Sequence, residues 1–202
     1  MHPKVKICGM TNAETIQTAI KHKVDYLGFV FYPKSPRNLT PDQARELTKN
    51  IPQNVKRIAV LVNAKDEFIE QIKDYFDCFQ LHGHEDVKRI KELKQKFNKG
   101  IIKAIRVTDE ASARTFSQFE DDVDMLIFDS PAMEKTAKFD WQILSKLKIT
   151  KPYLIAGSIN INNVDEILKY NPTGVDVSAG VESSLGVKSN EKIIEFLNKV
   201  KS

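Results

Sequence analysis

The chain has 202 residues, of which 41% are hydrophobic and 29% are charged. A chain of this size buries roughly 70% of its unfolded surface, so this composition excludes a disordered or fibrous protein. The 31 basic and 27 acidic residues give a net charge of +4, which is spread along the chain. Nucleic-acid binding is therefore not expected, because the positive charge forms no block.

The longest apolar runs and the two cysteines narrow the class of protein further. Runs such as 58–62 and 153–156 are far shorter than the ~18 residues of a membrane helix, so we expect no membrane partner. The first residues lack the apolar core and cleavage site of a signal peptide, and we expect a cytoplasmic protein. Cys8 and Cys78 then stay reduced, and they predict neither a disulfide framework nor a cysteine metal cluster.

Short β-rich segments alternate with amphipathic segments of helical periodicity along the chain. The predicted strands are 5–8, 26–31, 57–62, 78–82, 101–107, 124–129, 153–156 and 175–178. The predicted helices lie near 12–21, 41–49, 66–75, 85–97, 110–119, 140–147, 161–169 and 190–200. Two helix starts carry local signals: Thr11 to Glu14 has the pattern of a capping box, and Thr40 is followed by Pro41 at the first helical position.

The repeat of strand and helix predicts the architecture. Successive strands begin roughly 20 to 30 residues apart, and no linker rich in Pro, Gly or Ser interrupts the series. Alternating βα units require a parallel sheet covered by helices, and eight of them match a (β/α)8 TIM barrel. We predict one α/β domain over residues 1–202, with a parallel eight-stranded barrel. A doubly wound open sheet is the alternative.

Active sites of such barrels lie at the C-terminal ends of the strands. Cys8 ends the first predicted strand and shares a face with Lys6, so its thiol should point toward the barrel mouth. Asp129 ends the sixth strand and should enter the same mouth. A thiol and a carboxyl facing one pocket can act as base and acid. The alternative is that Cys8 is a small buried hydrophobic residue and that Asp129 caps the following turn. Cys78, at the start of the fourth strand, serves as a contrast.

Two further strand ends carry polar groups. Arg37 follows two rigid prolines and could present its planar fork to a carboxylate, although a surface arginine would look the same. His82 ends the fourth strand with Gln80 on its face and is a candidate polar contact to substrate. His84 has the other parity, and no further ligand stands at metal spacing, so no metal site is predicted.

Small residues follow the seventh and eighth predicted strands. Backbone N–H groups at such positions are suited to holding a phosphate, although glycines there also simply permit tight turns. The candidates are Gly157, Ser158, Ser178, Ala179 and Gly180. No glycine-rich nucleotide motif occurs, so a nucleotide cofactor is not expected.

Five segments in chain order are similar to the phosphoribosylanthranilate isomerase family of tryptophan biosynthesis. The resemblance covers nearly the whole chain and rests on segments 6–11, 27–32, 35–37, 80–83 and 174–182. It implies a (β/α)8 barrel without metal or organic cofactor. It also implies an acid–base Amadori rearrangement of N-(5-phosphoribosyl)anthranilate to 1-(2-carboxyphenylamino)-1-deoxyribulose 5-phosphate.

The resemblance also implies roles for the candidate residues. Cys8 would be the general base and Asp129 the general acid. Arg37 would meet the anthranilate carboxylate, and His82 and Asp176 would line the sugar. The small residues after strands seven and eight would hold the phosphate. The partner expected is a small phosphosugar, and the oligomeric state, monomer or homodimer, stays open.

The chain departs from the family pattern near the ligand. Residues 130–138 contain no glycine where the family has a glycine-rich loop, and Ser158 replaces a usual glycine. Two other readings remain. One is a different phosphosugar barrel, such as an aldose–ketose isomerase of histidine biosynthesis or an indole-glycerol-phosphate synthase, which use other strand-end groups than Cys8. The other is a barrel that binds without catalysis.

Overall fold

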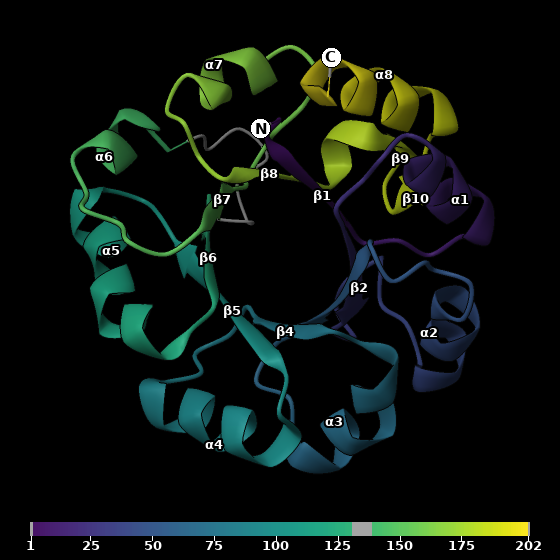
Figure 1. Ribbon diagram of the computed structural model, residues 1–202, viewed down its shortest axis with the longest axis horizontal. Coiled ribbons are helices and arrows are strands. Elements are labelled where there is room, and N and C mark those ends of the chain that lie inside the picture. The colour runs from purple at the N-terminus through teal and green to yellow at the C-terminus, as the bar shows by residue number, and fades with distance from the viewer. Residues whose placement is uncertain (1, 131–138, 202) are drawn as a thin grey trace.

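The predicted fold is confirmed by the computed structural model, which describes residues 2–130 and 139–201. Within these ranges eight parallel strands close into a barrel in the order of the sequence, and β8 pairs with β1 (Figure 1). The barrel strands are β1 Lys4–Cys8, β2 Tyr26–Phe31, β3 Lys56–Leu61, β4 Cys78–Leu81, β5 Gly100–Arg106, β6 Met125–Asp129, β7 Tyr153–Ile155 and β8 Gly174–Val177. The closed order excludes the doubly wound open sheet.

Helices surround the barrel as an outer ring (Figure 1). They are α1 Ala13–Lys21, α2 Pro41–Thr48, α3 Asp66–Ile72, α4 Val87–Phe97, α5 Glu110–Arg114, α6 Gln142–Ser145, α7 Val164–Leu168 and α8 Asn190–Lys201. Short 3-10 turns, Lys73–Tyr75 and Thr115–Gln118, follow α3 and α5. The single helices expected over 66–75 and 110–119 therefore end in tighter turns, as helix ends often do.

One local prediction is wrong, and one small element was not predicted. The capping box at Thr11 is wrong, because α1 begins one residue later. Its cap is Asn12, whose side chain accepts hydrogen bonds from the backbone N–H groups of Glu14 at 2.8 Å and Thr15 at 3.2 Å. The sequence also did not predict a small antiparallel hairpin after β8, formed by β9 Glu182–Ser184 and β10 Val187–Lys188.

The alternation of side chains along the strands gives the barrel two apolar layers. The outer layer lies between strands and helices, and Val5 and Ile7 of β1 belong to it. The inner cluster fills the barrel with Ile58, Ile102, Ile127, Leu154 and Ala156. Met125 packs against this inner cluster. Asp129 lies four residues further along the same strand and has the same parity, so it points to the inside at the C-terminal rim.

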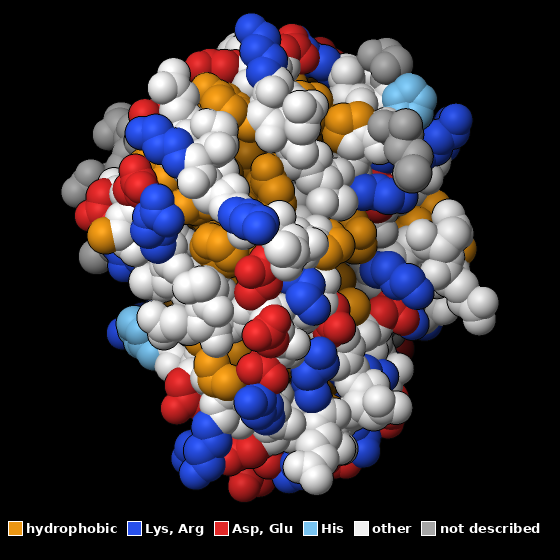
Figure 2. Space-filling view, turned by 60° about the vertical axis from the view of Figure 1, so that its left-hand side comes forward, with side chains coloured by type: hydrophobic (Ala, Val, Ile, Leu, Met, Phe, Trp, Pro, Cys, Tyr) orange, Lys and Arg blue, Asp and Glu red, His pale blue; other side chains and the backbone are white. Residues whose placement is uncertain are grey.

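No helix in the described ranges is long and apolar enough to cross a membrane. Figure 2 shows one face of the molecule, on which basic and acidic side chains are interspersed. The densest basic stretch of the chain includes α4, which buries Ile90, Leu93 and Phe97. Lysines of this helix, Lys94 among them, pair with nearby acidic groups. These lysines therefore form an ordinary charged helix surface.

One ion pair is buried between the strands and the helices. Lys103 of β5 donates to a carboxylate oxygen of Glu85 at 3.0 Å, and both side chains are 4% exposed. The other oxygen of Glu85 accepts from the backbone N–H of Asn63 at 2.7 Å, after β3. Gly83, after β4, also donates to this carboxylate, at 2.9 Å. The pair thus fixes two neighbouring loops at the barrel rim.

We expect Lys103→Met to lower the free energy of unfolding by about 3 kcal/mol, because it leaves the Glu85 carboxylate buried without its cation. Urea unfolding measures the change. Lys94→Met is the control, since Lys94 forms a more exposed pair with Asp124 and should cost no more than about 0.5 kcal/mol. Equal losses in the two variants would contradict the prediction.

Candidate functional site

The C-terminal rim brings the candidate side chains of β1, β4, β6 and β8 to one mouth. Cys8 is partly exposed at the end of β1, beside Gly28 of β2. Across the barrel, Asp129 ends β6 and is also partly exposed. Asp176 of β8 interacts electrostatically with both Cys8 and Asp129. Base and acid candidates therefore face one mouth with a common carboxylate between them.

The side of this mouth that β1 and β8 form is charged and buried. The Lys6 ammonium donates to Asp176 at 2.8 Å, and the two side chains are 0% and 7% exposed. Burial works to lower the pKa of Lys6, but the Asp176 carboxylate and the Cys8 thiol outweigh it, and the pKa is raised. Lys6 is therefore a cation in the barrel interior. The second carboxylate oxygen of Asp176 is buried and has no partner within the described residues.

The opposite side pairs two of the predicted residues. The Nε2 atom of His82 lies 3.3 Å from a carboxylate oxygen of Asp129. Its Nδ1 atom lies 3.1 Å from the side-chain nitrogen of Gln80, which shares its face of β4. The His82 ring is thus held at both nitrogens. It places a proton donor or acceptor directly beside the proposed acid.

Arg37 lies at the mouth, but its fork meets a carboxylate of the same chain. Its Nε and Nη2 atoms donate to the two oxygens of Glu182 at 2.6 and 2.8 Å. Lys188 of β10 donates to the same carboxylate at 2.8 Å and is 1% exposed. Burial raises the pKa of Glu182, yet the donors around it, Arg37 and Lys188 first, bring it down to about 2. The hairpin therefore locks Arg37 in place.

The same lysine connects the hairpin to the first strand. Lys188 donates to the backbone carbonyl of Ser178 at 3.1 Å. The Ser178 hydroxyl in turn donates to the backbone carbonyl of Cys8 at 3.0 Å. The end of β1 is thus fixed from β8 and β10.

The small residues after β7 and β8 lie together. A Cβ atom on Gly180 would overlap the backbone carbonyl of Ile159, so the two loops touch. Ser158 adopts a left-handed backbone with φ of 53°, which costs a non-glycine residue about 1 kcal/mol. Its carbonyl accepts from the side chains of Asn160 at 3.1 Å and Asn163 at 2.9 Å, which hold this conformation.

The backbone N–H groups of these loops are available. In residues 2–130 and 139–201 no acceptor is found for the N–H groups of Gly157, Ser158, Ala179 and Gly180. Such groups form an anion-binding surface when they converge. Of the glycine-free segment 130–138, residues 131–138 lie outside the described residues.

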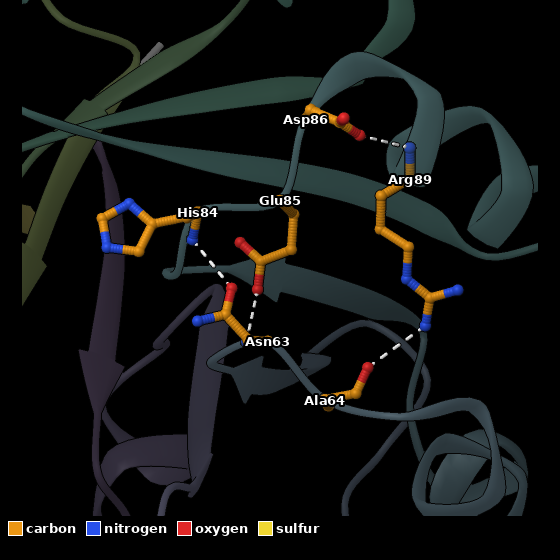
Figure 3. Close-up of a pocket in the computed structure, with 6 residues that line it drawn as sticks. All are labelled: Asn63, Ala64, His84, Glu85, Asp86 and Arg89. Atoms are coloured by element: carbon orange, nitrogen blue, oxygen red, sulfur yellow. Dashed lines mark hydrogen bonds between the residues drawn. The ribbon is translucent and has the colours of Figure 1, made fainter.

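A pocket of about 290 Å³ lies beside the mouth, not in it. It opens between the loops after β3 and β4 and is lined by Asn63, Ala64, His84, Glu85, Asp86 and Arg89 (Figure 3). The Asn63 side chain accepts from the backbone N–H of His84 at 2.9 Å. The Arg89 guanidinium donates to the Ala64 carbonyl at 3.1 Å. These contacts join the loops that line the pocket, and the pocket adds nothing to the chemistry of the mouth.

Sequence reasoning did not assign Lys6, Glu182 and Lys188, which shape the charge of the mouth. The buried position of Lys6 was visible only as a lysine sharing the face of Cys8. Glu182 and Lys188 lie on the hairpin that was not predicted, although Gly186 between its strands is a turn signal. Cys78 packs against the inner cluster at the start of β4, and burial raises its pKa to about 11. No cluster of metal ligands occurs among the described residues.

Fold and site together define a (β/α)8 barrel whose C-terminal rim carries a thiol, carboxyl groups, an imidazole and available backbone N–H groups. A family model described as N-(5'phosphoribosyl)anthranilate (PRA) isomerase matches residues 5–199. The chain is 37% identical to the N-(5'-phosphoribosyl)anthranilate isomerase of Bradyrhizobium diazoefficiens, over 96% of this chain and 91% of that protein. The chain belongs to the phosphoribosylanthranilate isomerase family.

Solved structures support this assignment. A phosphoribosyl anthranilate isomerase in complex with reduced 1-(o-carboxyphenylamino)-1-deoxyribulose 5-phosphate superposes with a TM-score of 0.88, at 31% identity and 98% coverage of both chains. Monomers generated from the dimeric enzyme of Thermotoga maritima give a TM-score of 0.88 at 30% identity, again over 98% of both chains.

We expect Glu182→Gln to lower the free energy of unfolding by about 3 kcal/mol at neutral pH, because the carboxylate is held by Arg37 and Lys188. The pKa of Glu182 is about 2, below its ordinary value of 4.5, so the folded chain binds its proton less readily. This stability is complete above pH 4.5 and is lost as the pH falls toward 2.

Urea unfolding of the parent protein and Glu182→Gln, from pH 7 to pH 2.5, measures this difference. The two free energies should converge as the solution becomes acidic. A difference that stays constant over this range would contradict the assigned role of the carboxylate. Glu14→Gln, at an exposed position of α1, is a control for the substitution itself.

Proposed function

We propose that the chain converts N-(5-phosphoribosyl)anthranilate to 1-(2-carboxyphenylamino)-1-deoxyribulose 5-phosphate in tryptophan biosynthesis. The observation that carries this proposal is the position of Cys8 and Asp129, at one mouth, in a chain that belongs to the isomerase family over residues 5–199. The reaction moves one hydrogen and opens a ring, which acid–base groups can perform.

Asp129 is the proposed general acid and Cys8 the proposed general base. The protonated carboxyl gives its proton to the ring oxygen of the ribose, the bond from this oxygen to C1 breaks, and an iminium ion forms. The Cys8 thiolate then takes the proton from C2, which leaves an enolamine. Tautomerisation of the enolamine gives the ketone. The positions of both groups at strand ends support these roles.

Each remaining candidate residue is assigned to one part of the substrate. Arg37 has its Nη1 edge left for the anthranilate carboxylate, because Glu182 takes only Nε and Nη2. His82 and the unpartnered oxygen of Asp176 are suited to the hydroxyl groups of the sugar. The available N–H groups after β7 and β8, with Ser178, are suited to the phosphate.

The same proposal also concerns the cellular location of the reaction and the partners of the protein. A related isomerase is seen with a reduced product-like phosphosugar, and this supports a small phosphosugar as the partner. Neither nucleic acid nor a membrane is needed, and we keep the cytoplasm as the site of action. A relative is described in dimeric and monomeric forms, so a monomer and a homodimer are both compatible with the fold.

The first test follows the loss of fluorescence of phosphoribosylanthranilate, generated in situ, on addition of the purified protein. Cys8→Ala and Asp129→Asn should each lower turnover at least about 100-fold, because each removes a proton-transfer group. Cys78→Ser is the matched control and should retain turnover, since Cys78 lies at the start of β4. Decay at the spontaneous rate with folded parent protein would sink the proposed function.

The phosphate assignment has a separate test. Gly180→Ala should raise KM about tenfold, because a Cβ atom would overlap the Ile159 carbonyl and force the loops after β7 and β8 apart. We expect kcat to change less, since the acid and base stay in place. Steady-state kinetics and circular dichroism of the folded variant check this. An unchanged KM would remove these loops from the phosphate site.

A further inference from the structure

Lys6 is a buried charged group to which the proposed reaction gives no role. It is 0% exposed inside the barrel and is held by Asp176 at 2.8 Å. A methyl group built on Gly28 would lie 3.1 Å from its Nζ atom and 3.1 Å from the Sγ atom of Cys8. The Nζ atom of Lys6 and the Sγ atom of Cys8 therefore lie no further apart than about twice this distance.

The other charged groups that face Cys8 come from three separate elements. Asp176 faces it from β8 and Lys188 from β10. Arg37 faces it from the segment after β2. Lys188 and Arg37 share the single Glu182 carboxylate. Lys6 is the cation that lies on the same strand and the same face as Cys8.

We propose that Lys6 is a positioning residue for Cys8, whose buried ammonium, fixed by Asp176, stabilises the thiolate form of that side chain. This inference rests on the proposed function in one respect, the use of the Cys8 thiolate as base. A thiolate inside a barrel is costly because it loses water, and a nearby cation offsets this cost. Lys6 therefore acts through Cys8 and needs no contact with substrate.

The direction of the electrostatic effects agrees with this geometry. Burial raises the pKa of the Cys8 thiol, and among the groups that oppose this rise the Lys6 ammonium acts most strongly. Asp176 raises the pKa of Cys8 further and Lys188 lowers it. Removal of the Lys6 charge should thus shift the titration of Cys8 toward higher pH.

The experiment measures the titration of Cys8 directly and needs no substrate. In a Cys78→Ser background, Cys8 is the only thiol of the chain. The rate of its alkylation by iodoacetamide is followed by intact mass from pH 7 to pH 11, because the pKa of the Cys8 thiol is raised. The plateau at high pH reports access to the thiol, and the midpoint reports its protonation. In Lys6→Gln we expect the rate at pH 7.5, relative to its own plateau, to fall at least about tenfold.

Two more variants separate charge from structure. Lys6→Met with Asp176→Asn leaves no unpaired charge in the barrel, and it should show the same direction of change if Lys6→Gln fails to fold. Lys103→Met with Glu85→Gln removes a similarly buried ion pair from the outer layer, and it should leave the midpoint where it is. A midpoint of Cys8 unchanged in both Lys6 variants would overturn the inference.

The outcomes also separate this inference from the proposed function. A shifted midpoint in a protein whose parent shows no turnover would keep Lys6 as the partner of the thiolate while removing the isomerase activity. An unchanged midpoint, with turnover lost in Cys8→Ala, would remove Lys6 from its role and leave the isomerase proposal in place.

Discussion

The closure of the barrel between β8 and β1 is the constraint on which the site depends. The parallel pairing sets Lys6 opposite Asp176 and continues to Ile7 and Val177, so the two strands end at the same rim. Cys8 and Ser178 come directly after these pairs and are linked by a hydrogen bond of 3.0 Å. Because parallel strands place all their C-terminal ends on one side, residues 170 positions apart share one mouth.

The architecture was predictable because it depends on local patterns. Each βα unit repeats the same change from strand to helix periodicity, and the eight predicted strands agree with the observed ones to within one or two residues. The hairpin of β9 and β10 was not predicted because strands of 3 and 2 residues are too short to show alternation of apolar and polar side chains. The start of α1 was misplaced because Thr11 and Asn12 are both good caps, and only the folded chain decides between them.

The site was predictable only as far as it depends on local patterns. Strand-end position and parity were enough to point Cys8 and Asp129 toward the mouth. The partners of these groups depend on tertiary distances that no spacing encodes. Arg37 meets Glu182 across 145 residues of sequence. The ion pair of Lys6 and Asp176 likewise joins the first strand of the barrel to its last. An isolated arginine or lysine in a sequence carries no sign of which carboxylate it will find.

Two of the buried ion pairs, Lys103 with Glu85 and Lys6 with Asp176, show that charge inside this barrel needs a specific reason. Replacing such a pair by apolar side chains of similar volume is often neutral or stabilising. The outer pair, Lys103 and Glu85, has a structural reason, since Glu85 also receives the backbone N–H groups of two rim loops. Lys6 and Asp176 bind no backbone donor of a loop, and one oxygen of Asp176 stays unpartnered in the described chain. Stability alone does not account for this inner pair. The role proposed for Lys6, to stabilise the thiolate of the neighbouring Cys8, does account for it.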